Sequence, residues 1–187
     1  MAAKNFPEIN VIYTRDTDEF IGLASRAKIA NKAGADFFLS IHANAVDGPS
    51  ASGFESWVLG LHRTKAALEV AKKENSAILM EDDHDQTYEE FNPEDPDAYI
   101  ALSMRQNAFL DQSLVFADLL QKECTKKLGI KNRGVKQAGF MVLYRATMPA
   151  VLVAISPALV AMSAVLVAIS VSLDAVNDAV VASSIEL

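Results

Sequence analysis

The chain has 187 residues, of which 51% are hydrophobic, and its formal net charge is -7. This length suffices for one sizeable hydrophobic core and is short for two, so we expect a single domain over residues 1–187. The negative charge argues against a nucleic-acid partner, which would require a basic surface. The single cysteine, Cys124, can form no intrachain disulfide, so the redox compartment cannot be read from it.

The first predicted elements alternate between strand and helix. Residues 10–13 predict a short strand, and Thr17 is placed to cap a helix whose apolar residues recur at helical spacing. Gly34 is expected to end that helix. Two further strands are predicted over residues 37–43 and about 54–59. Strands that alternate with helices predict an α/β fold, with a mixed, mostly parallel central sheet flanked by helices.

His42 closes the apolar strand predicted over residues 37–43. Ligands of such sheets bind at the carboxyl ends of the strands, which makes His42 a candidate metal ligand. A histidine on an apolar strand can equally be a hydrogen-bonded core residue. The strand by itself leaves both interpretations open.

An acidic segment occupies residues 81–97, which include nine Asp or Glu residues and no Lys or Arg. The spacing of a calcium-binding loop is absent. We therefore expect a solvated insertion loop, since charge runs are usually solvated. Its place in the chain suggests an insertion beside an active-site cleft, where it could gate a bulky substrate.

The second half of the chain begins with a long amphipathic pattern. Apolar residues from about Ala98 to Leu128 predict a helix that packs on the core and ends at Gly129. Strands are then expected over residues 140–144 and 151–155.

The apolar tail over residues 149–187 differs from the rest of the chain. Residues 146–173 carry no charge, and the stretch 148–156 nearly recurs as 162–170. An uncharged run of this length must be weighed as a membrane anchor. Pro149, Pro157 and many Ala and Ser residues interrupt the run and argue against an anchor.

Several motifs occur in a specific order. They are Tyr-Thr-Arg-Asp-Thr-Asp at 13–18, Leu-Ala-Ser-Arg at 23–26, Ser-Ile-His-Ala-Asn at 40–44, Gly-Phe-Glu at 53–55, Asn-Arg-Gly-Val-Lys-Gln at 132–137 and Met-Pro-Ala-Val-Leu-Val at 148–153. In this order the chain resembles the zinc-dependent N-acetylmuramoyl-L-alanine amidases, which cut peptidoglycan. The likeness covers most of the first 153 residues.

The resemblance implies a site. It makes zinc the expected cofactor and His42 a metal ligand, and it implies the amidase/phosphorylase-like form of the α/β fold. Asn44 and Glu55 become candidates to orient ligands or substrate at the rim of the cleft. For Glu55, a plain surface carboxylate on a strand is an equally good interpretation.

Two departures from the family put catalysis in doubt. The family's N-terminal strand, with a His-Gly-Gly-x-Asp-Pro-Gly block, and the following helix, with a glutamate ligand, have no counterpart in this sequence, so we expect a sheet without its first strand and helix. Ala154 stands where the family has its catalytic glutamate, which leaves no catalytic residue to assign. A catalytic zinc normally takes three protein ligands, and one imidazole cannot replace them. His62 and His84 are weaker candidates for a second ligand.

Two functions are therefore carried forward. In the first, the chain is a zinc-dependent peptidoglycan hydrolase that cleaves the amide between N-acetylmuramic acid and the L-alanine of the stem peptide. In the second, it is a catalytically inactive amidase-like fragment with a structural or peptidoglycan-binding role. The family acts in the periplasm or cell envelope, whereas residues 1–10 contain no apolar core of a signal peptide. Whether an activator protein is needed cannot be predicted.

Overall fold

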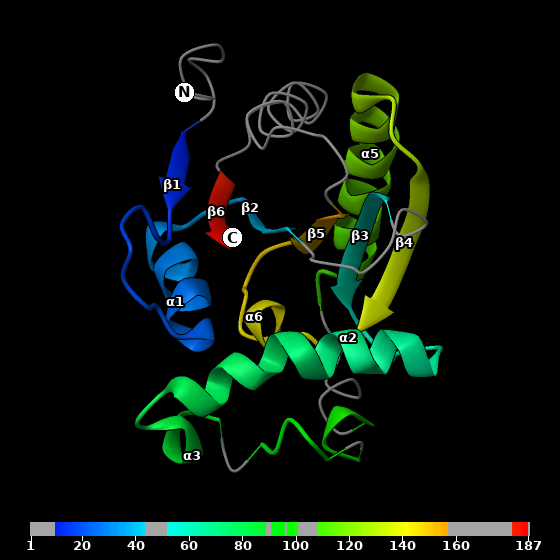
Figure 1. Ribbon diagram of the computed structural model, residues 1–187. Helices are drawn as coiled ribbons and strands as arrows, with labels where there is room; N and C mark the ends of the chain where they lie inside the picture. The colour runs from blue at the N-terminus through cyan, green and yellow to red at the C-terminus, as the bar shows by residue number, and fades with distance from the viewer. Residues whose placement is uncertain are drawn as a thin grey trace.

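The computed structural model describes residues 10–43, 52–88, 91–95, 97–100 and 108–156, together with the backbone of 181–186. Within these residues a six-stranded sheet forms the centre of the molecule, in the order β1-β6-β2-β5-β3-β4 (Figure 1). The strands are β1 Val11–Tyr13, β2 Phe37–Ala43, β3 Gly53–Leu59, β4 Asn132–Ala138, β5 Ala150–Ser156 and β6 Val181–Glu186. All neighbours are parallel except β3 and β5, which confirms the predicted mixed, mostly parallel sheet.

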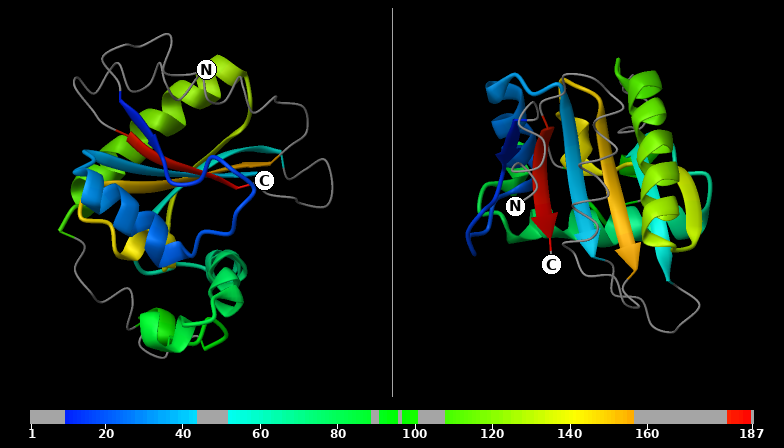
Figure 2. Two further views of the ribbon diagram at one scale, coloured as in Figure 1. Left: turned by 90° about the vertical axis from the view of Figure 1, so that its left-hand side faces the viewer. Right: turned by 90° about the horizontal axis from the view of Figure 1, so that it is seen from above.

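Helices cover both faces of this sheet (Figure 2). One face carries α5, Leu110–Leu128, which packs on residues such as Leu39 and Val153. The opposite face carries α1, α2 and α6, which pack around Phe38, Trp57 and Leu152. The bounds of the remaining elements are α1 Leu23–Ala33, α2 Lys65–Asn75, the 3-10 helix η3 Ser76–Met80, α3 His84–Thr87 and α6 Met141–Tyr144.

Helix α1 begins later than the sequence indicates. The predicted cap Thr17 lies outside the helix, and Gly22 precedes its first residue. The first amides are bonded from a distant segment instead: Leu23 donates to Glu81 at 3.1 Å and Ala24 to the Tyr88 hydroxyl at 2.9 Å. These bonds satisfy amides at the helix start, a role that a local cap such as Thr17 would otherwise have. The predicted end at Gly34 is confirmed, with φ +64°.

The acidic segment is partly built into the fold. Tyr88 and Tyr99 are 5% and 0% exposed, and the carboxylate of Glu81 accepts bonds from the α1 amide and from Tyr88. Burial, and the hydrogen bond to Glu81, raise the pKa of Tyr88 above its ordinary value. The expectation of a solvated loop is therefore wrong for Glu81 and Tyr88. Other acidic residues of the segment are exposed, as expected: Asp82, Asp83, Glu94, Asp95 and Asp97. The expectation of a flap remains untested, as does that of a single domain over residues 1–187.

Two further predictions need correction. Helix α5 begins at Leu110 rather than near Ala98, although its end at Gly129 is as predicted; residues 101–107 lie outside the described part. The stretch predicted as a strand over 140–144 forms the short helix α6 instead. The strand of this region is β4, Asn132–Ala138, whose polar residues concealed it.

The C-terminal strand lies in the interior of the sheet. Strand β6 pairs with β1 through Val11–Tyr13 on one side and with β2 through Phe37–His42 on the other. Strand β6 thus lies between β1 and β2, and the strand predicted over residues 10–13 forms one edge of the described sheet. Residues 157–180, which include most of the uncharged run, lie outside the described residues. Among the helices that are described, none is long and apolar enough to span a bilayer.

Candidate functional site

Three residues that the sequence singled out lie in one row across the sheet. Strand pairing places His42 of β2 opposite Ala154 of β5, and Ala154 opposite Glu55 of β3. Paired residues of adjacent strands share a face of the sheet, so all three lie on the face that α1, α2 and α6 cover. In the pairing of β2 with β6, the backbone position opposite His42 is Glu186.

His42 is buried and has polar neighbours at both ring nitrogens. Its Nδ1 lies 2.9 Å from a carboxylate oxygen of Glu74 on α2, and its Nε2 lies 3.0 Å from the Ser40 hydroxyl. Only 6% of His42 is exposed. When Nδ1 carries a proton, it donates to Glu74 and leaves Nε2 as the acceptor, which is the arrangement in which a carboxylate orients a histidine.

The sequence did not identify Glu74. No helix was predicted over residues 60–80, although Thr64 caps α2 by accepting from the Ala67 amide at 3.1 Å. Buried Ala67, Ala71 and Asn75 recur on that helix at helical spacing. This pattern could have located the helix. It could not have shown that Glu74 bonds His42, which lies on a strand 32 positions earlier in the chain.

Glu55 is buried and fully engaged by protein donors. One carboxylate oxygen accepts from the indole of Trp57 at 3.1 Å, and the other accepts from Arg133 at 3.2 Å and from Lys136 at 2.5 Å. It is 8% exposed, so the interpretation as a plain surface carboxylate is wrong. A carboxylate that already accepts three bonds is suited to hold cations in place.

The described residues do not form a zinc site by themselves. No group of three His, Cys, Asp or Glu side chains suited to a metal ion occurs among them. The one imidazole of the row, His42, bonds the carboxylate of Glu74, and His84 instead lies with its Nδ1 2.9 Å from the Glu81 carbonyl. His62 joins no such group in the part of the chain that is described. Three ligands are needed, and these donors fall short of them. Asn44 lies outside the described residues, so its role remains a prediction.

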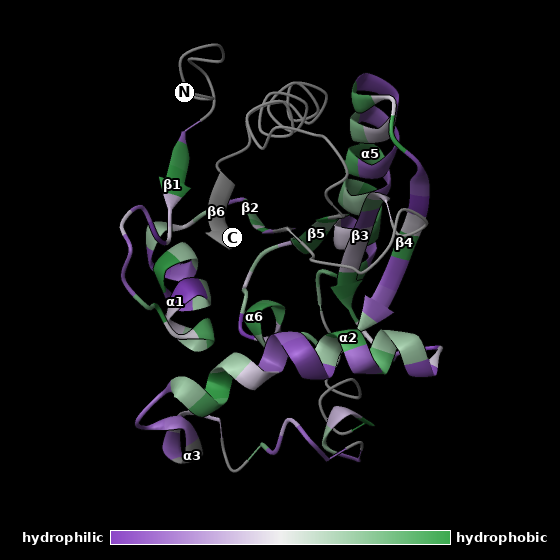
Figure 3. Ribbon diagram, in the orientation of Figure 1, coloured by the Kyte–Doolittle hydropathy of each residue, from purple (hydrophilic) through white to green (hydrophobic). Residues whose placement is uncertain are grey.

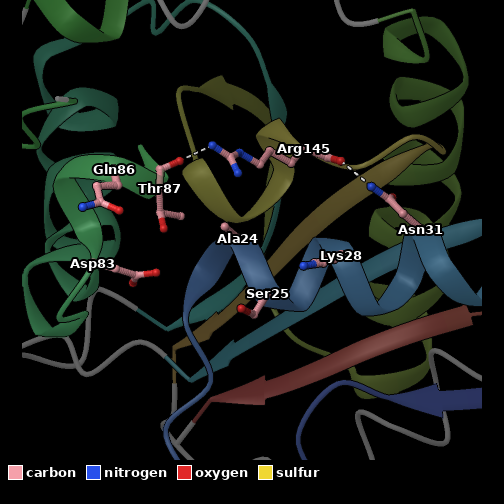
Figure 4. A pocket seen from close by; sticks show the side chains of 8 residues that line it. All are labelled: Ala24, Ser25, Lys28, Asn31, Asp83, Gln86, Thr87 and Arg145. Atoms are coloured by element: carbon pink, nitrogen blue, oxygen red, sulfur yellow. Dashed lines mark hydrogen bonds between the residues drawn. The ribbon is translucent and has the colours of Figure 1, made fainter. Parts of the chain in front are cut away.

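A separate pocket of about 500 Å³ lies between α1 and α3 (Figure 4). Lys28, Asp83 and Gln86 contribute polar groups to its wall. Arg145 at its edge donates to the Thr87 carbonyl and lies over the Tyr88 ring, and its own carbonyl accepts from Asn31. Through Arg145 these bonds connect α3 to α1, so the residues around this pocket help to hold the acidic segment against α1.

Comparison with known proteins identifies relatives of this chain. A family described as N-acetylmuramoyl-L-alanine amidase matches residues 2–156. The amidase AmiA of Escherichia coli K12 is 29% identical over 154 residues, which are 79% of this chain and 50% of AmiA. An endolysin of Bacillus phage SPP1 is 31% identical over 145 residues, which are 78% of this chain and 37% of the endolysin. The chain thus spans half the length of AmiA and less of the endolysin.

The fold is also found among solved structures. The catalytic domain of CwlV, an amidase from Bacillus (Paenibacillus) polymyxa var. colistinus, superposes with a TM-score of 0.54 at 22% identity. That match covers 94% of this chain and 76% of the CwlV domain. An amidase from Clostridium difficile 630 matches with a TM-score of 0.51 at 20% identity, over 87% of this chain and 67% of that one. At such identities the likeness establishes the fold alone.

Proposed function

The chain belongs to the N-acetylmuramoyl-L-alanine amidase family, and from this premise we propose that it is a peptidoglycan hydrolase acting in the cell envelope. The bond cleaved is the amide between the lactyl group of N-acetylmuramic acid and L-alanine of the stem peptide. The observation that carries the proposal is the family match over residues 2–156, which contains the row of His42, Ala154 and Glu55.

Zinc is part of the proposal. His42 would be one ligand, and the other ligands would have to lie outside the described residues, since those present do not complete a set. Bound zinc supplies Lewis-acid polarisation of a carbonyl and an acidified water. His42→Ala should therefore lower the amount of zinc retained after dialysis, whereas the same change at His62 should not.

The residues around the row would orient the histidine and transfer the proton. Glu74 orients the His42 ring by bonding its Nδ1, while Nε2 lies 3.0 Å from the Ser40 hydroxyl. Ala154 can transfer no proton, and a carboxylate there would stand between His42 and Glu55. General acid/base catalysis typically contributes about a hundred- to ten-thousand-fold in rate. Turnover by the parent chain should accordingly be lower than turnover by the Ala154→Glu variant by a factor in this range.

Release of stem peptide from purified peptidoglycan tests the proposal. Ala154→Glu is expected to raise the rate about a hundredfold or more. Ala154→Gln, an isosteric control whose amide cannot act as a general acid or base, is not expected to raise it. His42→Ala in the Ala154→Glu background should abolish the gain. Ala154→Glu protein that is folded and retains bound zinc but releases no stem peptide would overturn the proposed function. The alternative, an inactive amidase-like fragment, is not favoured by matches to proteins named as amidases.

A further inference from the structure

Two cations on the edge strand β4 lie on the face of the sheet that carries the candidate site. Arg133 and Lys136 both bond one oxygen of Glu55, the residue that pairs with Ala154. Their side chains are 31% and 35% exposed, so both cations reach solvent while Glu55 does not. The cluster has two positive charges against one negative, in a chain whose net charge is -7.

A β-bulge brings the two cations to the same face. Residues three apart on a regular strand point to opposite faces of the sheet. Here Phe54 pairs with Asn132 but Ser56 pairs with Val135, so Arg133 and Gly134 together oppose Glu55. Bulges of this kind re-aim side chains and are frequent beside active sites. Figure 3 shows that most of β4 is hydrophilic, as its position at the edge of the sheet allows.

Two glycines with positive φ lie at the bulge, and Gly53 leaves room for the side chain of Arg133. Gly53 has φ +145°, and a Cβ there would come within 2.7 Å of the Lys131 carbonyl and 2.9 Å of the Arg133 side chain. Gly134 has φ +82°, and its amide donates to Asn132 at 2.8 Å. Only glycine adopts these conformations at low cost, so the sequence is specialised for the bulge.

The contacts leave binding capacity on both cations. Arg133 bonds Glu55 through Nε, and its two terminal nitrogens make no bond to another described residue. Lys136 lies 4.8 Å over the ring of Trp57 and uses one of its three donors on Glu55. A guanidinium and an ammonium with remaining donors, held by a buried carboxylate, are suited to a second carboxylate that arrives from solvent.

We propose that Arg133 and Lys136 form a subsite that binds a carboxylate of the stem peptide, with Glu55 as the residue that positions both cations. This inference rests on the proposed function, because it takes the peptide part of peptidoglycan as the ligand. Glu55 thereby acquires a role different from the one predicted from the sequence. It holds substrate-binding groups rather than the substrate or a metal ligand.

Trp57 offers a direct readout of binding, since it is the single tryptophan of the chain and contacts both Glu55 and Lys136. The probes are N-acetylmuramyl-L-alanyl-D-glutamic acid and its diamide, titrated against Trp57 fluorescence. The free acid should bind roughly tenfold or more tightly than the diamide, as charge-assisted hydrogen bonds require. Arg133→Gln with Lys136→Gln should reduce this ratio to about one, whereas Lys127→Gln, an exposed cation on α5, should preserve it.

Further variants separate binding from folding. Arg133→Lys keeps the charge and should retain most of the preference for the acid, even if the double variant folds poorly. Glu55→Gln should lower the preference, because the cations lose the group that holds them. Equal affinity of the parent chain for acid and diamide, or no binding of either, would overturn the subsite. Turnover of peptidoglycan with equal affinities would overturn the subsite and leave the proposed function intact. Selective binding of the acid without hydrolysis by Ala154→Glu would leave the subsite intact and overturn the proposed function.

Discussion

At the scale of single residues, buried polar side chains with distant partners determine the local structure. Glu81 receives the first amide of α1 and the hydroxyl of Tyr88, and Asn75 bonds the backbone on both sides of Phe140. The α1 amide and the backbone beside Phe140 could not be foreseen as partners, because they lie 58 and 64 positions away in the chain. His42 could be foreseen, since an imidazole at the end of an apolar strand stands out by residue type. Its partner Glu74 could not be foreseen, because it is one glutamate in a charged stretch of helix α2.

Buried tyrosines should make the protein sensitive to alkali. Burial raises the pKa of Tyr99 to about 12, and its hydroxyl donates to the Pro93 carbonyl at 3.0 Å. An unfolded tyrosine ionises near pH 10, so the folded state binds this proton more tightly than the unfolded state does. The resulting stability is complete below about pH 10 and is lost as the pH rises towards 12. Tyrosinate absorbance and circular dichroism, followed together against pH, should show Tyr99 ionising as the fold is lost.

The matched variants for this experiment are Tyr99→Phe and Tyr13→Phe. The first should lower stability at neutral pH by about 1 kcal/mol, the value of a buried hydrogen bond, and make the alkaline loss of stability shallower. The second changes a tyrosine that is 40% exposed and should leave the alkaline transition in place. If all tyrosines ionised together near pH 10 in a protein that stayed folded, burial of Tyr99 would not control its proton.

At the scale of elements, the bulge on β4 should be the most demanding piece of local backbone. Gly53→Ala places a Cβ against the Lys131 carbonyl at a positive φ, and we expect a loss of roughly 3 kcal/mol. Gly34→Ala is the control, because it has a positive φ with no atom within 4 Å and should cost only about 1 kcal/mol. Urea unfolding measures both. Equal losses would mean that the close approach at Gly53 carries no strain of its own.

The elements that the sequence predicted correctly share a physical reason. β2, β3 and β5 are strands of seven residues rich in apolar side chains, and α1 and α5 both end at glycines with positive φ. β4 was missed because an edge strand with a bulge can be polar, and its sequence Asn-Arg-Gly-Val-Lys-Gln-Ala shows no regular alternation. The strand prediction over residues 140–144 is wrong because a short apolar run fits a buried helical turn as well as a strand. The bulge that brings Arg133 to Glu55 depends on three-dimensional pairing, so no pattern along the chain announces it.

At the scale of the whole molecule, the sheet joins the two ends of the described chain. β1 is a three-residue edge strand that pairs only with β6 among the described strands, and β6 also covers the edge of β2 (Figure 1). A row of unpaired backbone groups on a parallel, apolar strand is a template for association. The position of β6 thus decides whether the half of the sheet that holds His42 is closed.

This position gives a test with the 187-residue chain. Ser183 pairs with Tyr13 on β1 and with Leu39 on β2, so Ser183→Pro removes a ladder donor from the interior of the sheet. We expect β6 to detach and the exposed edge of β2 to drive association, which light scattering would report as oligomers or aggregates at concentrations where the parent chain is smaller. Ser183→Thr, which retains the donor and suits a strand, should behave like the parent. A monodisperse Ser183→Pro protein of unchanged size and stability would show that β6 does not hold the sheet closed. Something other than β6 would then have to protect the edge of β2 from association.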